Sequence, residues 1–165
     1  MGNLRRLNKM HSLIPREECS HFRLAAALGL QRRGHEPGKV LPVALPKGDW
    51  ECVLNWRKVS QGKAEALDPR RITEDGAEAV ALAVISEAMG WKVVRRYPQG
   101  RHADWELSDA QNRVIALEIS GCARNDPRRL KKKLTQVAKC KYAHLRVACV
   151  VEFGPPRARM AEVGG

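Results

Sequence analysis

The segment 113–120 constrains the fold most strongly, because it is apolar on both of its alternating faces. One face carries Ile115, Leu117 and Ile119, and the other carries Val114, Ala116, Glu118 and Ser120. Such a strand is typical of the centre of a sheet that helices cover on both sides. The sequence therefore predicts a layered α/β protein with a carboxylate, Glu118, buried in its central strand. An unpaired buried carboxylate is costly, so we expect an arginine, a lysine or a metal ion to face Glu118.

The neighbouring segments supply the other elements of a layered core. Apolar periodicity and end signals predict helices over 73–90 and 126–142, and strands over 91–97, 102–107 and 145–153. The element order is α-β-β-β-α-β. We expect residues 73–153 to form a mixed central sheet flanked by helices.

The two ends of the chain give weaker patterns. Residues 1–72 are predicted to be a basic N-terminal extension, with a helix over 15–33, an extended connector over 35–48 and a strand within 50–59. Pro155 and Pro156 stop the last strand, so residues 154–165 are predicted to be a C-terminal tail.

A second carboxylate, Asp104, is expected close to Glu118. If the strands 102–107 and 113–120 form a hairpin with a five-residue loop, Leu107 faces Arg113 and Asp104 faces Ala116. Asp104 and Glu118 then become diagonal neighbours, with Cα atoms about 7–8 Å apart. Two carboxylates at that separation can bind one Mg²⁺ ion. The alternative is an ordinary pair between Glu118 and an arginine, with Asp104 facing solvent.

The positive charge of the chain is concentrated in one region. The chain carries a net charge of +12. Between residues 124 and 141 there are eight basic residues and one acidic residue. A segment of this kind favours a polyanionic partner, most commonly nucleic acid, although a solvated helix face gives the same pattern. The residues best placed for contacts with phosphates are Arg124, Arg128, Arg129, Lys131 and Lys132.

Several other classes of protein are disfavoured. The five cysteines are scattered and form no Cys-x-x-Cys pair, which argues against a zinc site or a disulfide framework. The longest apolar stretch is too short to span a bilayer, and the first residues lack the apolar region of a signal peptide. We therefore expect a soluble, cytoplasmic protein without a membrane partner.

The predicted core resembles the PD-(D/E)XK nuclease superfamily, the proteins with a restriction endonuclease-like core. The resemblance rests on the αβββαβ order, on Asp104 at the start of the hairpin and on Glu118-Ile119-Ser120, where the family has Glu-x-Lys. It implies a Mg²⁺-dependent endonuclease or other phosphodiesterase that acts on DNA or RNA, with Mn²⁺ able to substitute. Asp104 and Glu118 would be catalytic metal ligands, and Glu78 on the first helix would be an auxiliary ligand or an orienting group.

One departure from the family pattern concerns the lysine. Ser120 occupies its position, and a neutral hydroxyl cannot supply the positive charge that stabilises a developing anion. Some members of the family carry this lysine on the following helix, where Lys133 is the candidate and Gln136 lies three residues further on. Lys133 is catalytic in that hypothesis and solvated in the alternative. His102, Ser120 and Gln136 are further auxiliary candidates.

Two other functions fit the same residues. The first is a catalytically degenerate nuclease-fold subunit that binds nucleic acid or a protein partner, in a mobile element or a phage-defence system. The second is a basic RNA-associated protein without a metal site. A nuclease that cuts both strands of a duplex commonly dimerises, so a homodimer is among the expected states.

Overall fold

The computed structural model describes residues 3–164, without the side chains of Gln61 and Ala64. Its strands are β1 (Lys39–Leu45), β2 (Gly48–Leu54), β3 (Lys92–Arg96), β4 (Trp105–Ser108), β5 (Val114–Cys122), β6 (Leu145–Glu152) and β7 (Arg157–Glu162). Its helices are the 3₁₀ turn η1 (Leu4–Arg6), α1 (Leu7–Met10), α2 (Arg16–Gln31), α3 (Gln61–Ala64), α4 (Pro69–Met89) and α5 (Arg129–Val137).

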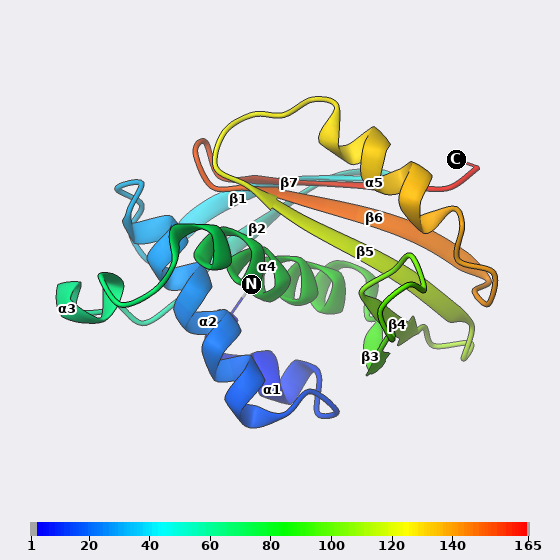
Figure 1. The fold of residues 1–165 in the computed structure, drawn as a ribbon, viewed down its shortest axis with the longest axis horizontal. Coiled ribbons are helices and arrows are strands. Elements are labelled where there is room, and N and C mark those ends of the chain that lie inside the picture. The colour runs from blue at the N-terminus through cyan, green and yellow to red at the C-terminus, as the bar shows by residue number, and fades with distance from the viewer. Residues whose placement is uncertain (1–2, 165) are drawn as a thin grey trace.

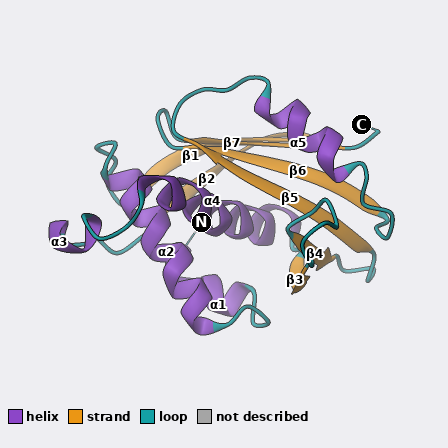
Figure 2. Cartoon of the chain, viewed as in Figure 1, coloured by secondary structure: helices purple, strands orange, loops and turns teal. Residues whose placement is uncertain are grey.

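The strands form one mixed sheet in the order β2-β1-β7-β6-β5-β4-β3. Strands β5 and β6 are parallel, and β3, β4 and β5 pair antiparallel in sequence order. Helices α4 and α2 lie on one side of the sheet and α5 lies on the other (Figures 1 and 2). The predicted α/β class, with a mixed sheet flanked by helices, is confirmed. No helix within residues 3–164 is long and apolar enough to cross a membrane.

The central strand β5 divides its side chains between two cores, as the sequence predicts. Ile115, Leu117 and Ile119 belong to the large core that includes α4. Ala116 belongs to a smaller core formed with Val137 of α5. Glu118 shares the face of Ala116 and therefore points toward α5.

Helix α4 begins four residues earlier than the sequence predicts. The Asp68 side chain accepts a hydrogen bond from the Arg70 backbone N–H, and Pro69 occupies the first turn. Both residues are favourable helix starters, so the helix begins there rather than at Thr73. Gly90 ends it with φ = 69°, as the sequence predicts.

Helix α4 approaches both of its neighbours closely at glycines. A Cβ atom on Gly76 would lie 3.1 Å from the backbone of Ala25 in α2. A Cβ atom on Gly121 in β5 would lie 2.2 Å from the carbonyl oxygen of Thr73. Glycine is therefore required at position 121 for α4 to lie at its observed distance from the sheet.

The register of the β4–β5 hairpin differs from the predicted one by two residues. Leu107 pairs with Ile115 rather than with Arg113. The loop keeps five residues but lies one position later, at 109–113, where the Asp109 carboxylate accepts hydrogen bonds from the backbone N–H groups of Gln111 and Arg113. Asn112 completes the turn at φ = 57°. A two-residue shift preserves the face of every side chain, and continuing this register places Asp104 directly opposite Glu118.

Residues outside the predicted core extend the same sheet. Residues 39–45 form β1, where a connector was predicted, and residues 157–162 form β7, where a tail was predicted. The sequence does not predict these two strands because prolines interrupt the strand pattern. Pro42 lies inside β1, and Pro155 and Pro156 lie in the turn before β7. The edge strand β2 ends at Leu54 rather than near Val59. The predicted N-terminal helix is present as α2.

Candidate active site

The loop between β3 and β4, residues 97–104, covers a cavity of about 330 Å³. The cavity is lined by Arg96, Tyr97, Pro98, Gln99, Gly100, His102, Ala103, Asp104, Glu118 and Gln136. Side chains from the β3–β4 hairpin, the central strand and α5 therefore meet at one place. It contains both of the carboxylates that the sequence singles out.

Asp104 is held in place by the backbone on both sides of it. Its carbonyl accepts a hydrogen bond from the Tyr97 N–H, and its own N–H donates to the Leu117 carbonyl, each at 2.9 Å. Its side-chain Oδ2 accepts a hydrogen bond from the Ile119 backbone N–H at 2.7 Å. These three bonds fix the carboxylate beside the central strand, so little rotational freedom is left for it to lose on binding a ligand.

Glu118 is 2% exposed and forms an ion pair with Lys133. The Lys133 Nζ donates to Glu118 Oε1 at 2.5 Å and to Gln136 Oε1 at 3.3 Å. The second carboxylate oxygen, Oε2, is also buried, and no described residue donates a hydrogen bond to it. A buried carboxylate oxygen without a donor is unusual in a folded protein. Its polar neighbour in the cavity is the Asp104 carboxyl.

The electrostatics of the cavity disfavour charge on its carboxylates. Burial raises the pKa of Glu118 to about 7, with the nearby charge of Asp104 acting in the same direction and Lys133 opposing it. Burial also raises the pKa of Asp104, against the effect of the hydrogen bond from Ile119. Two facing carboxylates that are both largely desolvated repel each other. A bound cation would relieve this repulsion.

A second cation from α5 reaches the central strand at Ser120. The Arg129 guanidinium donates to Ser120 Oγ at 3.0 Å and to the Gly121 carbonyl at 3.1 Å. It also pairs with Asp126 at 3.2 Å. The sequence places Arg129 among the phosphate contacts and does not predict its contact with Ser120. The sequence does contain one signal for this contact. Arg129 and Lys133 are four residues apart, so both side chains lie on the face of α5 that meets β5.

Glu78 lies on α4, across the sheet from α5, and does not line the cavity. Its Oε2 accepts a hydrogen bond from the indole Nε1 of Trp105 at 2.5 Å. Burial, followed by the charge of Asp104, raises the pKa of Glu78 to about 8. Arg96 lies over the Trp105 ring at 4.1 Å and also lines the cavity. Glu78 is therefore linked through Trp105 to Arg96, which lines the cavity.

The remaining candidate residues surround the site. His102 is exposed, lines the cavity and has φ = 64°, a conformation that residues other than glycine adopt rarely. Four of the five predicted phosphate contacts are exposed and none of these four lines the cavity: Arg124, Arg128, Lys131 and Lys132. They belong to the outer surface of α5 and the loop before it.

The cavity offers a divalent metal ion two carboxylates, and water would supply the remaining ligands. Within the described residues, no group of three or more His, Cys, Asp or Glu side chains is arranged to hold a metal ion. Mg²⁺ commonly keeps several waters and binds proteins through one or two carboxylates. Asp104 and the free Oε2 of Glu118 provide such a pair. The residues present fit a divalent ion held in this way.

Comparisons with known proteins gave no match, whether with family models, with characterised proteins or with solved structures.

Proposed function

We propose that this chain is a divalent-metal-dependent nuclease that hydrolyses phosphodiester bonds in DNA, or in RNA by the same chemistry. The observation that carries the proposal is that Asp104 and Glu118 meet at one cavity, while Lys133 of α5 pairs with one oxygen of Glu118 and the other oxygen has no donor among the described residues. Paired carboxylates beside a lysine suit hydrolysis of a phosphodiester, which needs charge stabilisation and a positioned water.

The arrangement of the elements supports a PD-(D/E)XK-like core within this proposal. Residues 69–152 follow the order α4-β3-β4-β5-α5-β6, with Asp104 just before β4 and Glu118 in β5. Lys133 of α5 reaches the carboxylate of Glu118, which is the role proposed for a lysine moved from position 120. The serine at that position is hydrogen-bonded to Arg129 instead.

In the proposed mechanism, Asp104 and Glu118 hold the metal ion. When bound, a Mg²⁺ or Mn²⁺ ion supplies a Lewis acid for a phosphoryl oxygen and lowers the pKa of the attacking water. Lys133, which donates to Glu118 Oε1, would also donate a hydrogen bond toward the negative charge that develops on the phosphate. Arg129 fixes the backbone of β5 beside Glu118 through Gly121 and Ser120.

The exposed basic residues of α5 would hold the substrate. Arg128, Lys131 and Lys132 lie on the outer surface of the helix that carries Lys133, and Arg124 precedes it. Contacts of lysine and arginine with phosphates orient a nucleic acid without reading its sequence. A nucleic-acid strand bound to this surface would pass beside the cavity.

A second function is favoured by the Lys133–Glu118 ion pair itself. A buried glutamate with a lysine 2.5 Å away already has a compensating charge from the protein. The chain would then be a catalytically degenerate member of the same architecture that binds nucleic acid or a partner protein. Binding of nucleic acid would survive EDTA and would be insensitive to Glu118→Gln.

A cleavage assay with matched variants tests the first proposal. Purified protein is incubated with plasmid, single-stranded DNA and RNA, with Mg²⁺, with Mn²⁺ or with EDTA. We expect metal-dependent cleavage that falls by about 100-fold or more in Asp104→Asn, Glu118→Gln and Lys133→Met. Lys139→Met removes an exposed lysine outside the site and serves as the control. Cleavage of no substrate, or cleavage that both carboxylate variants retain, would reject the nuclease proposal.

A further inference from the structure

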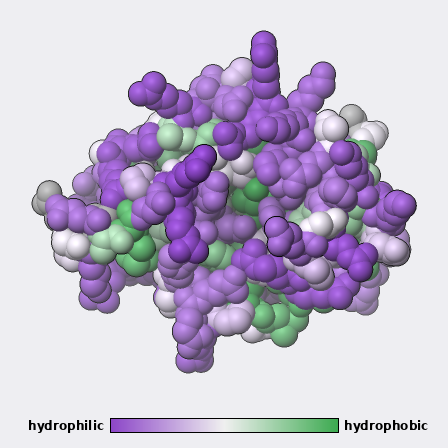
Figure 3. Space-filling model, in the orientation of Figure 1, coloured by the Kyte–Doolittle hydropathy of each residue, from purple (hydrophilic) through white to green (hydrophobic). Residues whose placement is uncertain are grey.

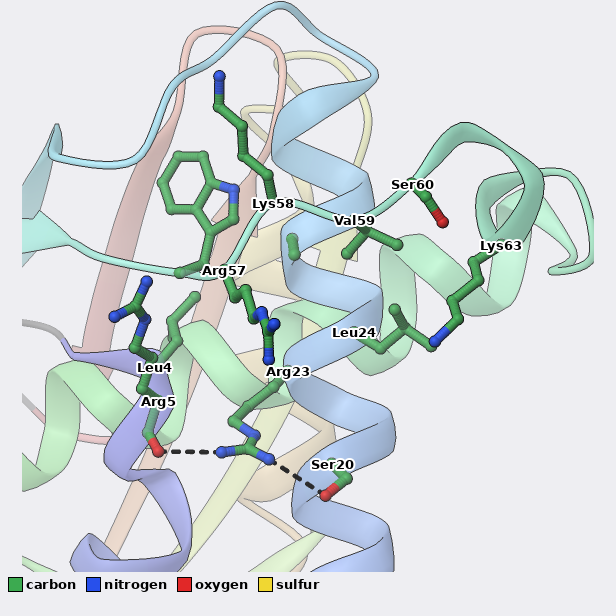
Figure 4. A pocket seen from close by; sticks show the side chains of 12 residues that line it. Leu4, Arg5, Ser20, Arg23, Leu24, Arg57, Lys58, Val59, Ser60 and Lys63 are labelled. Carbon is green, nitrogen blue, oxygen red and sulfur yellow. Dashed lines mark hydrogen bonds between the residues drawn. The ribbon is translucent and has the colours of Figure 1, made fainter.

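A second and larger cleft lies away from the candidate active site. It has a volume of about 770 Å³ and is bordered by the N-terminal turn, one side of α2, the segment 56–60 and α3 (Figure 4). Segments far apart in the sequence thus form one surface. The face of the molecule shown in Figure 3 is mostly hydrophilic, with smaller apolar patches between the hydrophilic side chains.

The lining of this cleft carries positive charge only. Its charged members are Arg5, Arg23, Arg57, Lys58 and Lys63. No aspartate or glutamate is among its lining residues within the described part of the chain. The four cations other than Lys58, which pairs with Glu36, lie along one concave surface and focus a positive potential there. The expected occupant is therefore an anion with several charges.

Two of the cations have defined partners. Arg23 donates to the Arg5 carbonyl at 2.9 Å and to Ser20 Oγ at 3.1 Å, which fixes its guanidinium between η1 and α2 (Figure 4). Lys58 pairs with Glu36 at 2.5 Å. Arg57 and Lys63 are exposed. They are thus positioned to contact a ligand from two different segments.

The base of the cleft is apolar with one buried donor. Leu4, Leu24, Ala27 and Val59 supply the apolar surface. Trp56 is 2% exposed, and its indole Nε1 is buried without a hydrogen-bond partner among the described residues. A buried indole N–H usually has an acceptor. A ligand with both apolar and acceptor groups, as well as negative charge, matches this lining.

Helix α2 separates the cleft from the candidate active site. Glu18 and Phe22 contact Arg96, which lines the active-site cavity. Ser20, Arg23 and Ala27 line the cleft. At 3.6 residues per turn, these three positions lie on the side of α2 opposite Glu18 and Phe22. The cleft is thus a separate surface and not an extension of the active-site cavity.

We propose that this cleft is a second nucleic-acid contact, which binds a strand with its phosphates on the cations and a base or sugar over the apolar floor. The choice of nucleic acid as the occupant rests on the proposed function, while the multiply charged, part-apolar character of the occupant rests on the lining itself. Each phosphate contact releases counterions, so binding at this surface weakens as salt rises.

Salt-dependent binding in EDTA tests the cleft without any cleavage. Fluorescence anisotropy measures the affinity for a labelled single-stranded oligonucleotide between about 50 and 200 mM KCl. The cleft variant is Arg57→Ala with Lys63→Ala, in the full chain. The control variant, Lys39→Ala with Lys47→Ala, removes the same charge from β1 and the following turn. We expect the slope of log affinity against log salt to fall by about two in the cleft variant and to stay unchanged in the control.

Equal slopes in the two variants, or no binding by the unmodified chain, would overturn the cleft proposal. A mononucleotide that displaces the strand would also overturn it, because the occupant would then be a free nucleotide. The cleavage assay reports separately on the nuclease proposal. A cleft variant that cleaves in Mg²⁺ but binds the strand with an unchanged slope would reject the cleft alone.

Discussion

Replacing Glu78 by glutamine should stabilise the protein at neutral and alkaline pH, because the change removes a carboxyl group that is costly to bury in its ionised form. The pKa of Glu78 is about 8 in the folded chain, against an ordinary value of 4.5, because the side chain is desolvated and close to Asp104. At about 1.4 kcal/mol per pKa unit, ionised Glu78 costs up to about 5 kcal/mol of stability. Glutamine keeps an oxygen that can accept the Trp105 hydrogen bond and carries no charge.

The sign of the pH dependence follows from the direction of the shift. The folded state binds the Glu78 proton more tightly than the unfolded state, so the free energy of unfolding falls as pH rises from about 4.5 to about 8. Because Glu78 retains some solvent contact, we expect Glu78→Gln to gain about 1–2 kcal/mol at pH 8 and almost nothing near pH 4.5.

Urea denaturation followed by circular dichroism, at several pH values, measures this difference. Glu74→Gln changes an exposed carboxylate on the same helix and is the matched control. A Glu78→Gln protein no more stable than the original at pH 8, or a difference that does not vary with pH, would refute the reasoning. An ionisable group kept at a cost in stability is typical of functional sites.

Three further predictions concern the scaffold. Gly121→Ala should destabilise the chain by about 1–3 kcal/mol in urea denaturation, because a Cβ atom would collide with the Thr73 carbonyl. Glu152→Ala should lower stability by about 3–5 kcal/mol in the same assay, because it leaves Arg157 and Arg159 without their buried partner. Burial lowers the pKa of His11, whose Nδ1 accepts a hydrogen bond from the Val93 N–H. As the pH is lowered from 6.5, the free energy of unfolding should therefore decrease by up to about 1.4 kcal/mol per pH unit. His11→Phe should flatten that acid limb in a pH series, and an unchanged limb would contradict the assignment.

The alternation within β5 was enough to predict the layered fold. Its two apolar rows require cover on both faces, and α4 and α5 provide it. The strands β1 and β7, which extend the sheet beyond the predicted core, could not be recognised in this way, because proline residues mark breaks in a sequence whether or not a strand continues nearby. Pro42 is tolerated because β1 pairs with β7 only at Val43 and Ala44.

The sequence predicts that the candidate site contains a pair of carboxylates, but it does not predict the hydrogen bonds that position them and the residues around them. Periodicity assigns Asp104 and Glu118 to one face, and a two-residue error in register left that assignment unchanged. The loop that sets the register depends on hydrogen bonds to Asp109, which sequence spacing alone does not reveal. The contact of Arg129 with Ser120 depends on side-chain direction, which also lies beyond a pattern of residue types.

Calorimetric titration with Mn²⁺ tests the central claim most directly, because it measures metal binding without any substrate. We expect binding at one site per chain that is lost in both Asp104→Asn and Glu118→Gln. Glu106→Gln removes a nearby carboxylate that pairs with Arg95 and should leave the binding intact. No binding by the unmodified chain, or binding that survives both site substitutions, would contradict the assignment of Asp104 and Glu118 as the metal ligands.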